Sequence, residues 1–168
     1  MIHWAHPQMS DPKADLARQL FQEAYEHQMT GDLDLAESLY KRSIELHPTA
    51  EAYTFLGWTY RYQGKIDEAI DECKNAILID PAYGNPYNDI GAYLIDKGLY
   101  DEALPWLEKA IASKRYESYH FAWYNLGRAY AEKEWYNKAR ECFRKALAID
   151  PGYAIAKEAL DAVTRLLQ

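Results

Sequence analysis

The sequence predicts an all-α fold in which antiparallel helix pairs stack side by side into an α-solenoid. Two sets of small residues recur along the 168-residue chain in the same register. The first set is Ala36, Ala69, Ala103 and Ala139, and the second is Ala24, Gly57, Gly91 and Gly127. In both sets the successive steps are 33, 34 and 36 residues. A period near 34 residues indicates stacked supersecondary units, each of which buries its apolar face against its neighbours.

Each period is expected to contain two helices. The second helix carries apolar residues at helical spacing, such as Ile66, Ile70 and Ile77. Second helices should end at His47-Pro48, Asp80-Pro81 and Asp150-Pro151, because proline lacks an amide donor and disfavours a helical residue before it. We therefore expect first helices at 51–62, 85–96 and 117–132, and second helices at 66–79, 100–113 and 136–149.

These recurring residues resemble the tetratricopeptide repeat (TPR) family, whose pattern is W-x2-L-G-x2-Y, then A-x3-F, then P. Residues 120–153 match best, with Trp123, Leu126, Gly127, Tyr130, Ala139, Phe143 and Pro151. The resemblance implies one domain, 13–168, wound into a right-handed superhelix with a concave groove. Its expected parts are repeats at about 17–49, 50–83, 84–119 and 120–153 and a capping helix at 154–168, after a flexible lead-in at 1–12.

Packing within a repeat is predicted from its small and large residues. Gly57 costs about 1 kcal/mol relative to alanine in a helix, so we expect Ala69 of the second helix to approach it closely. Tyr53, Leu56 and Tyr60 form one stripe and should fill the core of the repeat. In the capping helix, the expected apolar stripe is Ile155, Ala159, Ala162, Val163 and Leu166.

Two features depart from the regular pattern. The step from Gly91 to Gly127 is 36 residues, and the connection SKRYESYHF lacks proline. This predicts either a longer first helix in the last repeat or an irregular turn. Pro105 lies inside an expected second helix, where it removes the amide bond to Asp101 and should kink the helix unless it falls in the first turn.

The concave face is where a ligand is expected. Phe55, Trp58 and Tyr62 fall on a different helical face from the core stripe, and in a TPR stack that face lines the groove. Aromatic rings beside amides and charges suit an extended or helical peptide. The predicted peptide-binding residues are Tyr25, Phe55, Trp58, Arg61, Tyr62, Asn88, Asp89, Tyr124, Asn125 and Arg128. The alternative is that these rings pack on the neighbouring repeat. Trp4 of the lead-in is also a candidate occupant of the groove.

A carboxylate clamp for acidic chaperone tails, one known TPR binding mode, is not expected. The resemblance places Phe21, Tyr25 and Phe55 where the clamp has Lys or Asn. Only Asn125 and Arg128 resemble parts of that clamp.

The charge distribution argues against nucleic acid and anionic lipid as partners. The net charge is −7, and residues 17–49 and 50–83 each carry six acidic and three basic side chains. Residues 120–153 carry six basic and four acidic side chains. An acidic body lacks the basic face that such partners require. The gradient could orient a charged partner, or two copies head to tail.

No catalytic or metal site is predicted. Cys73 and Cys142 lie two repeats apart, too far for a disulfide, and are expected in the core. His3 and His6 are too few ligands for a metal. Acidic pairs such as Asp67-Glu68 are interpreted as first-turn acids that complement the helix dipole. No nucleophile–base set or phosphate loop occurs, so no enzyme activity or cofactor is expected.

The predicted function is therefore a non-catalytic scaffold that binds a protein or peptide segment in its concave groove. The alternative is a structural module that assembles into homo-oligomers. We expect a cytoplasmic location without membrane insertion, because the chain has no long apolar run and its start has no signal-peptide pattern.

Overall fold

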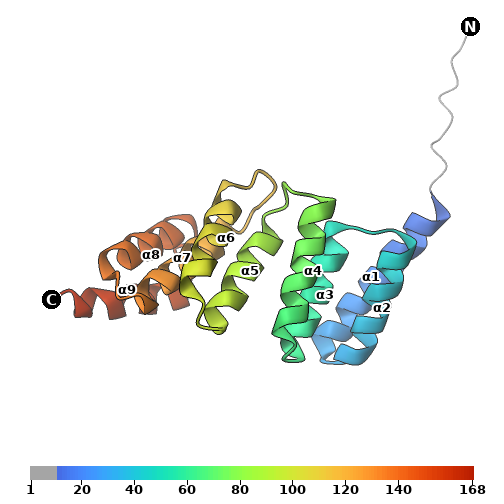
Figure 1. The fold of residues 1–168 in the computed structure, drawn as a ribbon, viewed down its shortest axis with the longest axis horizontal. Coiled ribbons are helices and arrows are strands. Elements are labelled where there is room, and N and C mark those ends of the chain that lie inside the picture. The colour runs from blue at the N-terminus through green and yellow to red at the C-terminus, as the bar shows by residue number, and fades with distance from the viewer. Residues whose placement is uncertain (1–10) are drawn as a thin grey trace, which may run out of the picture.

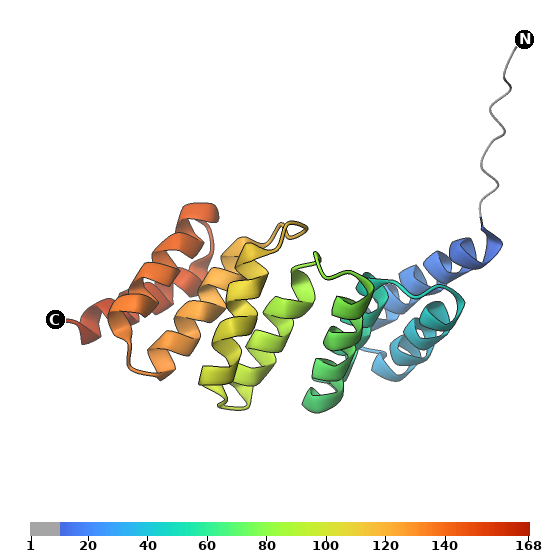
Figure 2. The same cartoon turned by 45° about the horizontal axis from the view of Figure 1, so that its top comes forward.

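The structure, a computed structural model, describes residues 11–168 and contains nine helices within that range. They are α1 (Pro12–Thr30), α2 (Leu33–Leu46), α3 (Ala50–Tyr62), α4 (Ile66–Ile79), α5 (Asn85–Asp96), α6 (Tyr100–Ala112), α7 (Tyr119–Glu132), α8 (Tyr136–Ile149) and α9 (Ala154–Leu166). Figures 1 and 2 show four helical hairpins side by side in chain order, with α9 at the C-terminal end. The predicted all-α solenoid is confirmed.

The turn inside each hairpin is fixed by one residue with a left-handed backbone. Gly31, Gly64 and Gly98 have φ values of 88°, 80° and 75°. Glycine adopts this conformation without the steric penalty of a side chain. In the fourth hairpin the same place is taken by Glu134, with a φ of 59°. Glu134 therefore holds a backbone that costs a non-glycine residue free energy.

Three of the second helices end as the proline pattern predicts. His47, Asp80 and Asp150 have extended backbones, and each donates its N–H to a carbonyl of the last helical turn. A proline follows each of them, and the residue before proline favours the extended conformation.

Close packing within the hairpins explains the small residues of the repeat. A methyl group added at Gly57 would lie 3.1 Å from the carbonyl oxygen of Ala69, so the predicted close approach is confirmed. At Gly91 and Gly127 the obstacle is instead a large side chain. An added methyl group would come within 2.5 Å of Leu107 and Phe143, respectively.

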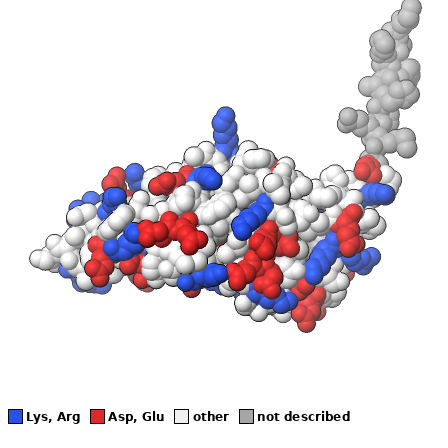
Figure 3. Space-filling view, in the orientation of Figure 1, with Lys and Arg blue, Asp and Glu red and all other residues white. Residues whose placement is uncertain are grey.

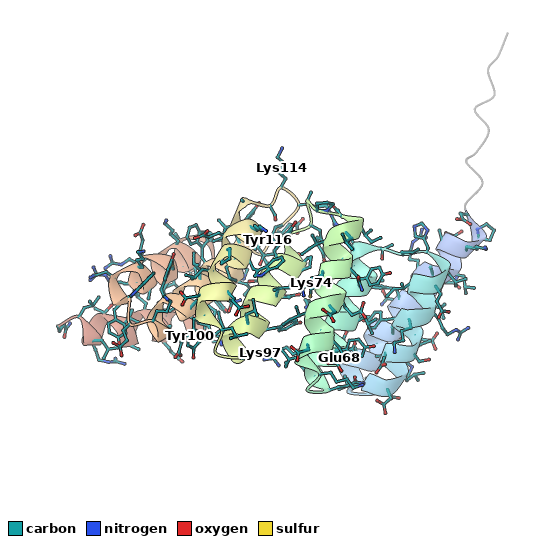
Figure 4. All side chains as sticks on the ribbon, viewed as in Figure 1. Glu68, Lys74, Lys97, Tyr100, Lys114 and Tyr116 are labelled. Atoms are coloured by element: carbon teal, nitrogen blue, oxygen red, sulfur yellow. The ribbon has the colours of Figure 1, made fainter. Side chains whose placement is uncertain are left out.

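The connection between α6 and α7 contains the departure from the period. Of the two alternatives, the irregular turn is correct, because 113–118 form a loop that docks on the preceding one. Arg115 donates its N–H to Ala82 O (3.1 Å) and accepts from Gly84 N (3.0 Å). Its guanidinium also contacts Asp80 and Glu51 at 2.7 and 2.8 Å. In Figure 4 Lys114 extends outward from this loop, whereas Tyr116 is buried.

Pro105 lies inside α6, past its first turn. The carbonyl of Asp101 therefore receives no amide bond from residue 105, as expected for a proline at this point. Cys73 and Cys142 are both free and buried, as predicted.

Both ends of the domain differ in detail from the expectation. α9 packs on α8 as a cap, and the predicted stripe is confirmed only in part. Val163 is buried and Ala159 packs against the same cluster, whereas Ile155 and Leu166 are 53% and 62% exposed and Ala162 is exposed too. α9 has only one neighbouring hairpin to cover it, so it buries a narrow strip around Ala156 and Val163. At the other end α1 already begins at Pro12, capped by the carboxylate of Asp11. The expected lead-in, with Trp4, His3 and His6, otherwise falls at residues 1–10, outside the described range.

Candidate peptide-binding groove

First helices of neighbouring hairpins meet at two of the three junctions. Helix α1 contacts α3 directly, and α5 contacts α7, in addition to the contacts within each hairpin. Side chains that leave these helices toward one another therefore meet across repeats. All ten predicted site residues lie on α1, α3, α5 or α7.

At the N-terminal end, an aromatic cluster is centred on Phe55 of α3. The Phe55 ring centroid lies 5.2 Å from Phe21, 5.7 Å from Tyr25, 6.2 Å from Tyr40 and 4.5 Å from Trp58. The contacts with Phe21 and Tyr25 are edge-to-face, an arrangement that stabilises a cluster beyond the area it buries. Phe55 therefore packs α1 and α2 against α3. This matches the alternative stated in the sequence analysis, in which the groove rings pack on the neighbouring repeat.

Beside this cluster lies a pocket of about 610 Å³, which we call the apolar pocket. Its lining residues are Tyr25, Gln28, Met29, Gly31, Leu33, Trp58 and Tyr62. Met29 and Tyr62 are 68% and 67% exposed. A pocket of this size, walled by apolar side chains that are open to water, can accept a large side chain of a ligand.

A chain of hydrogen bonds crosses the groove from α3 to α7. Trp58 Nε1 donates to Asp89 Oδ2 (2.5 Å), and Asn88 Nδ2 donates to Asp89 Oδ1 (3.3 Å). Asn125 Nδ2 donates in turn to Asn88 Oδ1 (3.0 Å). Asn88, Asp89 and Asn125 are all buried. Their polar groups therefore bind one another and hold three neighbouring repeats in register.

Two arginines extend this chain of bonds to the groove surface. Arg128 donates to Asn125 Oδ1 (3.1 Å) and to Asp96 Oδ1 (3.3 Å). Arg61 donates to the other oxygen of Asp96, Oδ2, at 2.6 Å. One carboxylate on α5 thus receives a guanidinium from α3 and another from α7. We refer to these bonds, from Trp58 to Asp96, as the inter-repeat network.

Asp89 is the most unusual group in this network. Burial raises its pKa to about 7, although the hydrogen bonds from Trp58 and Asn88 oppose the shift. It lines a smaller pocket of about 210 Å³, which we call the acidic pocket. The lining residues are Trp58, Arg61, Tyr62, Asp89 and Tyr93. The Tyr93 hydroxyl is buried and has no hydrogen-bond partner among residues 11–168.

At the C-terminal end, Tyr124 belongs to a second aromatic cluster. Its ring lies 5.8 Å from Phe143 and 5.2 Å from Tyr153, and the guanidinium of Arg128 lies 6.0 Å from its centroid. Phe121 packs on Tyr153 and is itself exposed. The ten predicted residues are therefore divided among two aromatic clusters, the two pockets and the inter-repeat network.

Sequence reasoning missed Met29, Leu33 and Tyr93. Met29 lies in the last turn of α1, four residues after Tyr25, so helical phase could have identified it. Leu33 is the first residue of α2, whereas the predicted groove residues all lie on first helices. Tyr93 could have been predicted, because it lies four residues after Asp89, and this spacing places two side chains on one helical face.

The described residues carry neither a metal cluster nor a membrane-spanning helix. Within 11–168 there is no group of three or more His, Cys, Asp or Glu side chains that could hold a metal ion. None of the helices in that range has the length and apolar character needed to cross a membrane. On the face drawn in Figure 3, Lys and Arg are interspersed with Asp and Glu, and no broad basic region is present.

The fold and groove define a repeat protein of the helical-hairpin α-solenoid class. Family models described as tetratricopeptide repeat match residues 50–83, 87–115 and 120–153. The chain belongs to the tetratricopeptide repeat family.

Three similar proteins illustrate its relationships. A small glutamine-rich tetratricopeptide repeat-containing protein 2 of Mycosarcoma maydis is 32% identical over 61% of this chain and 29% of its own length. The crystal structure of MamA protein has a TM-score of 0.73 at 25% identity, covering 90% of this chain and 82% of MamA. The first TPR of Spaghetti (RPAP3) bound to HSP90 peptide SRMEEVD has a TM-score of 0.66 at 24% identity, covering 71% of this chain and 93% of that one. The chain spans only 16% to 31% of the length of the curated relatives that it matches.

Proposed function

We propose that this protein is a non-catalytic interaction scaffold that binds a peptide segment of a partner protein in its concave groove. The observation that carries the proposal is the apolar pocket. Two of its residues, Met29 and Tyr62, expose most of their surface to water beside an aromatic cluster that is otherwise packed. Exposed apolar side chains gathered at one concave place are typical of an anchor site for a partner.

The kind of peptide is inferred from the side chains at the N-terminal end of the groove. The TPR structure of Spaghetti (RPAP3) holds an acidic HSP90 peptide. In this chain Phe21, Tyr25 and Phe55 stand where a carboxylate clamp has Lys or Asn, and they pack into the aromatic cluster. We therefore propose a ligand anchored by a large apolar side chain rather than by a terminal carboxylate.

The binding residues are proposed in two groups. Tyr25, Trp58 and Tyr62, with Met29 added, contact the ligand at the N-terminal end of the groove, and Tyr124 with Arg128 contacts it farther along. Arg61, Asn88, Asp89 and Asn125, together with Phe55, hold the groove in shape. The absence of catalysis, of a nucleic acid partner and of membrane insertion stays a prediction, as does the cytoplasmic location.

Selection from a random peptide library displayed on phage tests this function. Trp58 and Arg128 are poor positions for the test, because both belong to the inter-repeat network. The variant Met29→Ala with Tyr62→Ala removes two exposed side chains instead, and Leu78→Ala on α4, 80% exposed and outside either pocket, is the matched control. We expect selected peptides to bind the groove variant at least tenfold more weakly and the control with unchanged affinity. Failure to select any peptide, or equal binding to all three proteins, would reject the groove.

Self-assembly is a second candidate, favoured by the surface of α9. Ile155 and Leu166 expose apolar side chains at the C-terminal end, where residues 120–153 are basic, whereas the first two repeats are acidic. This arrangement suits head-to-tail packing of two copies. Light scattering over a concentration series tests it, with Leu166→Glu as the variant that should reduce any increase in mass. A monomer at all concentrations would eliminate self-assembly.

A further inference from the structure

The carboxylate of Asp89 is buried without a cation. Asp89 is 8% exposed, and its hydrogen-bond donors are the indole of Trp58 and the amide of Asn88, both neutral. The nearby guanidinium groups of Arg61 and Arg128 bind Asp96 instead. A buried carboxylate is costly in free energy unless an opposite charge or enough hydrogen bonds compensate it.

A second group in the acidic pocket also lacks a partner. The Tyr93 residue is 3% exposed, and its hydroxyl makes no hydrogen bond within the described structure. Buried polar groups are nearly always bonded, so an unpartnered hydroxyl requires an explanation. Asp89 and Tyr93 line one pocket, and both accept hydrogen bonds.

The guanidinium of Arg61 also lines this pocket, but it is paired with Asp96 at 2.6 Å, and the remaining walls suit a positive charge. Trp58 and Tyr62 contribute aromatic side chains, and ring faces attract an ammonium group. At about 210 Å³ the pocket is smaller than a pocket for a drug-sized molecule, and its size suits the end of one side chain. An anionic ligand would lie against Asp89 and would have to displace Asp96 from Arg61.

We propose that the acidic pocket binds the ammonium group of a lysine side chain in the bound peptide. The ammonium donates one hydrogen bond to Asp89 and a second to the Tyr93 hydroxyl, while the methylene stem lies between Trp58 and Tyr62. Lysine suits the pocket because it carries three donors on a compact head. The inference rests on the proposed function, since the peptide is the source of the lysine.

The position of the acidic pocket beside the apolar pocket predicts a feature of the peptide sequence that is recognised. Trp58 and Tyr62 line both the acidic and the apolar pocket. One ligand can therefore fill both, with a lysine in the first and a large apolar side chain in the second. The recognised segment carries these two residues near one another.

Titration with Nα-acetyl-lysine amide, followed by the indole NMR signal of Trp58, tests the inference. The signal is assigned by its loss in Trp58→Phe, and Nα-acetyl-norleucine amide is the neutral matched probe. At pH 8 we expect a saturable shift with the lysine amide only. Asp89→Asn should weaken it at least tenfold and Tyr93→Phe several-fold, whereas the exposed Asp71→Asn should leave it unchanged.

Two results would overturn the inference: an equal response to the norleucine amide, or undiminished binding of the lysine amide by Asp89→Asn. Neither result bears on the proposed function, which the peptide selection tests separately. If the selected peptides need the apolar pocket but carry no lysine, the proposed function is supported and the binding of lysine in the acidic pocket is contradicted. Tyr93→Phe also separates binding from folding, because loss of an unpartnered hydroxyl should not destabilise the protein.

Discussion

Replacing Asp89 with asparagine is expected to change how the stability of the protein depends on pH. Burial raises the pKa of Asp89 from 3.8 to about 7. The folded state therefore holds a proton on this carboxyl at pH values where the unfolded chain has already released it. Asparagine cannot ionise, and its amide resembles the protonated carboxyl in shape.

Proton linkage gives the sign and the size of the change in the free energy of unfolding with pH. Because the pKa is higher in the folded state, the free energy of unfolding falls as pH rises from about 4 to 7, and the loss is complete above 7. A shift of about three pKa units corresponds to about 4 kcal/mol at 1.36 kcal/mol per unit. We treat this as an upper value, since relaxation around the carboxylate lowers the penalty.

Urea denaturation at pH 5 and pH 8 measures the effect. Only about two of the three pKa units lie above pH 5, so the wild-type protein should lose up to about 2.7 kcal/mol between these pH values relative to Asp89→Asn. The comparison is one of slopes, because asparagine cannot accept from both Trp58 and Asn88 and so loses one hydrogen bond at every pH. Groups that the two proteins share contribute equally to both profiles and cancel in the comparison.

The other titratable groups whose pKa values depend on Asp89 do not titrate in the pH range from about 4 to 7. The groups whose pKa values its charge raises are Cys73, Tyr83, Tyr93 and Tyr116. They already titrate above pH 8 in the unfolded chain. Arg61 and Asp96, the charged pair nearby, bind each other at 2.6 Å and are present in both proteins. Parallel pH profiles for the wild type and Asp89→Asn would refute the assignment of an uncompensated carboxylate to this site.

Three further predictions concern the same helical stack. Trp58→Phe removes a donor from Asp89 and should cost about 1–3 kcal/mol at pH 8 but less at pH 5, by urea denaturation; equal losses would contradict the pairing. Gly127→Ala places a methyl group 2.5 Å from the buried Phe143 ring and should destabilise by about 1–3 kcal/mol; an unchanged melting temperature would mean that the ring can move aside. Glu134→Gly relieves the left-handed backbone and should stabilise by up to about 1 kcal/mol, with Glu134→Ala as the control that gives no such gain.

The sequence predicts the helices because its signals are local. The period of small residues sets the repeat register and the X-Pro stops fix helix ends, and the boundaries differ by at most two residues from those expected. At α9 the prediction is right for Ala159 and Val163 but wrong for Ile155, Ala162 and Leu166, since the apolar residues there can form more than one stripe. Which stripe is buried depends on how a single neighbouring hairpin meets the helix, and no pattern within α9 encodes that.

The site is predicted less completely for a similar reason. Helical phase places Asn88, Asp89 and Asn125 on the inner side of the stack, but it does not show what they meet there. The distance between repeats decides that they bind one another, as the 3.0 Å bond between Asn125 and Asn88 demonstrates. Exposed Met29 and Tyr62 provide the open surface instead.

Stability and recognition are joined in this groove at Asp89. The residue aligns α3 with α5 through Trp58, and the same carboxylate is left without a cation. A cationic ligand that pairs with Asp89 offsets the burial penalty, so it stabilises the folded state by more than its other contacts alone provide. Protonation offsets the same penalty without a ligand. Protons and a basic ligand therefore compete for one group, and lysine amide should bind more weakly at pH 5 than at pH 8 to the wild type, while Asp89→Asn should show weak binding at both pH values.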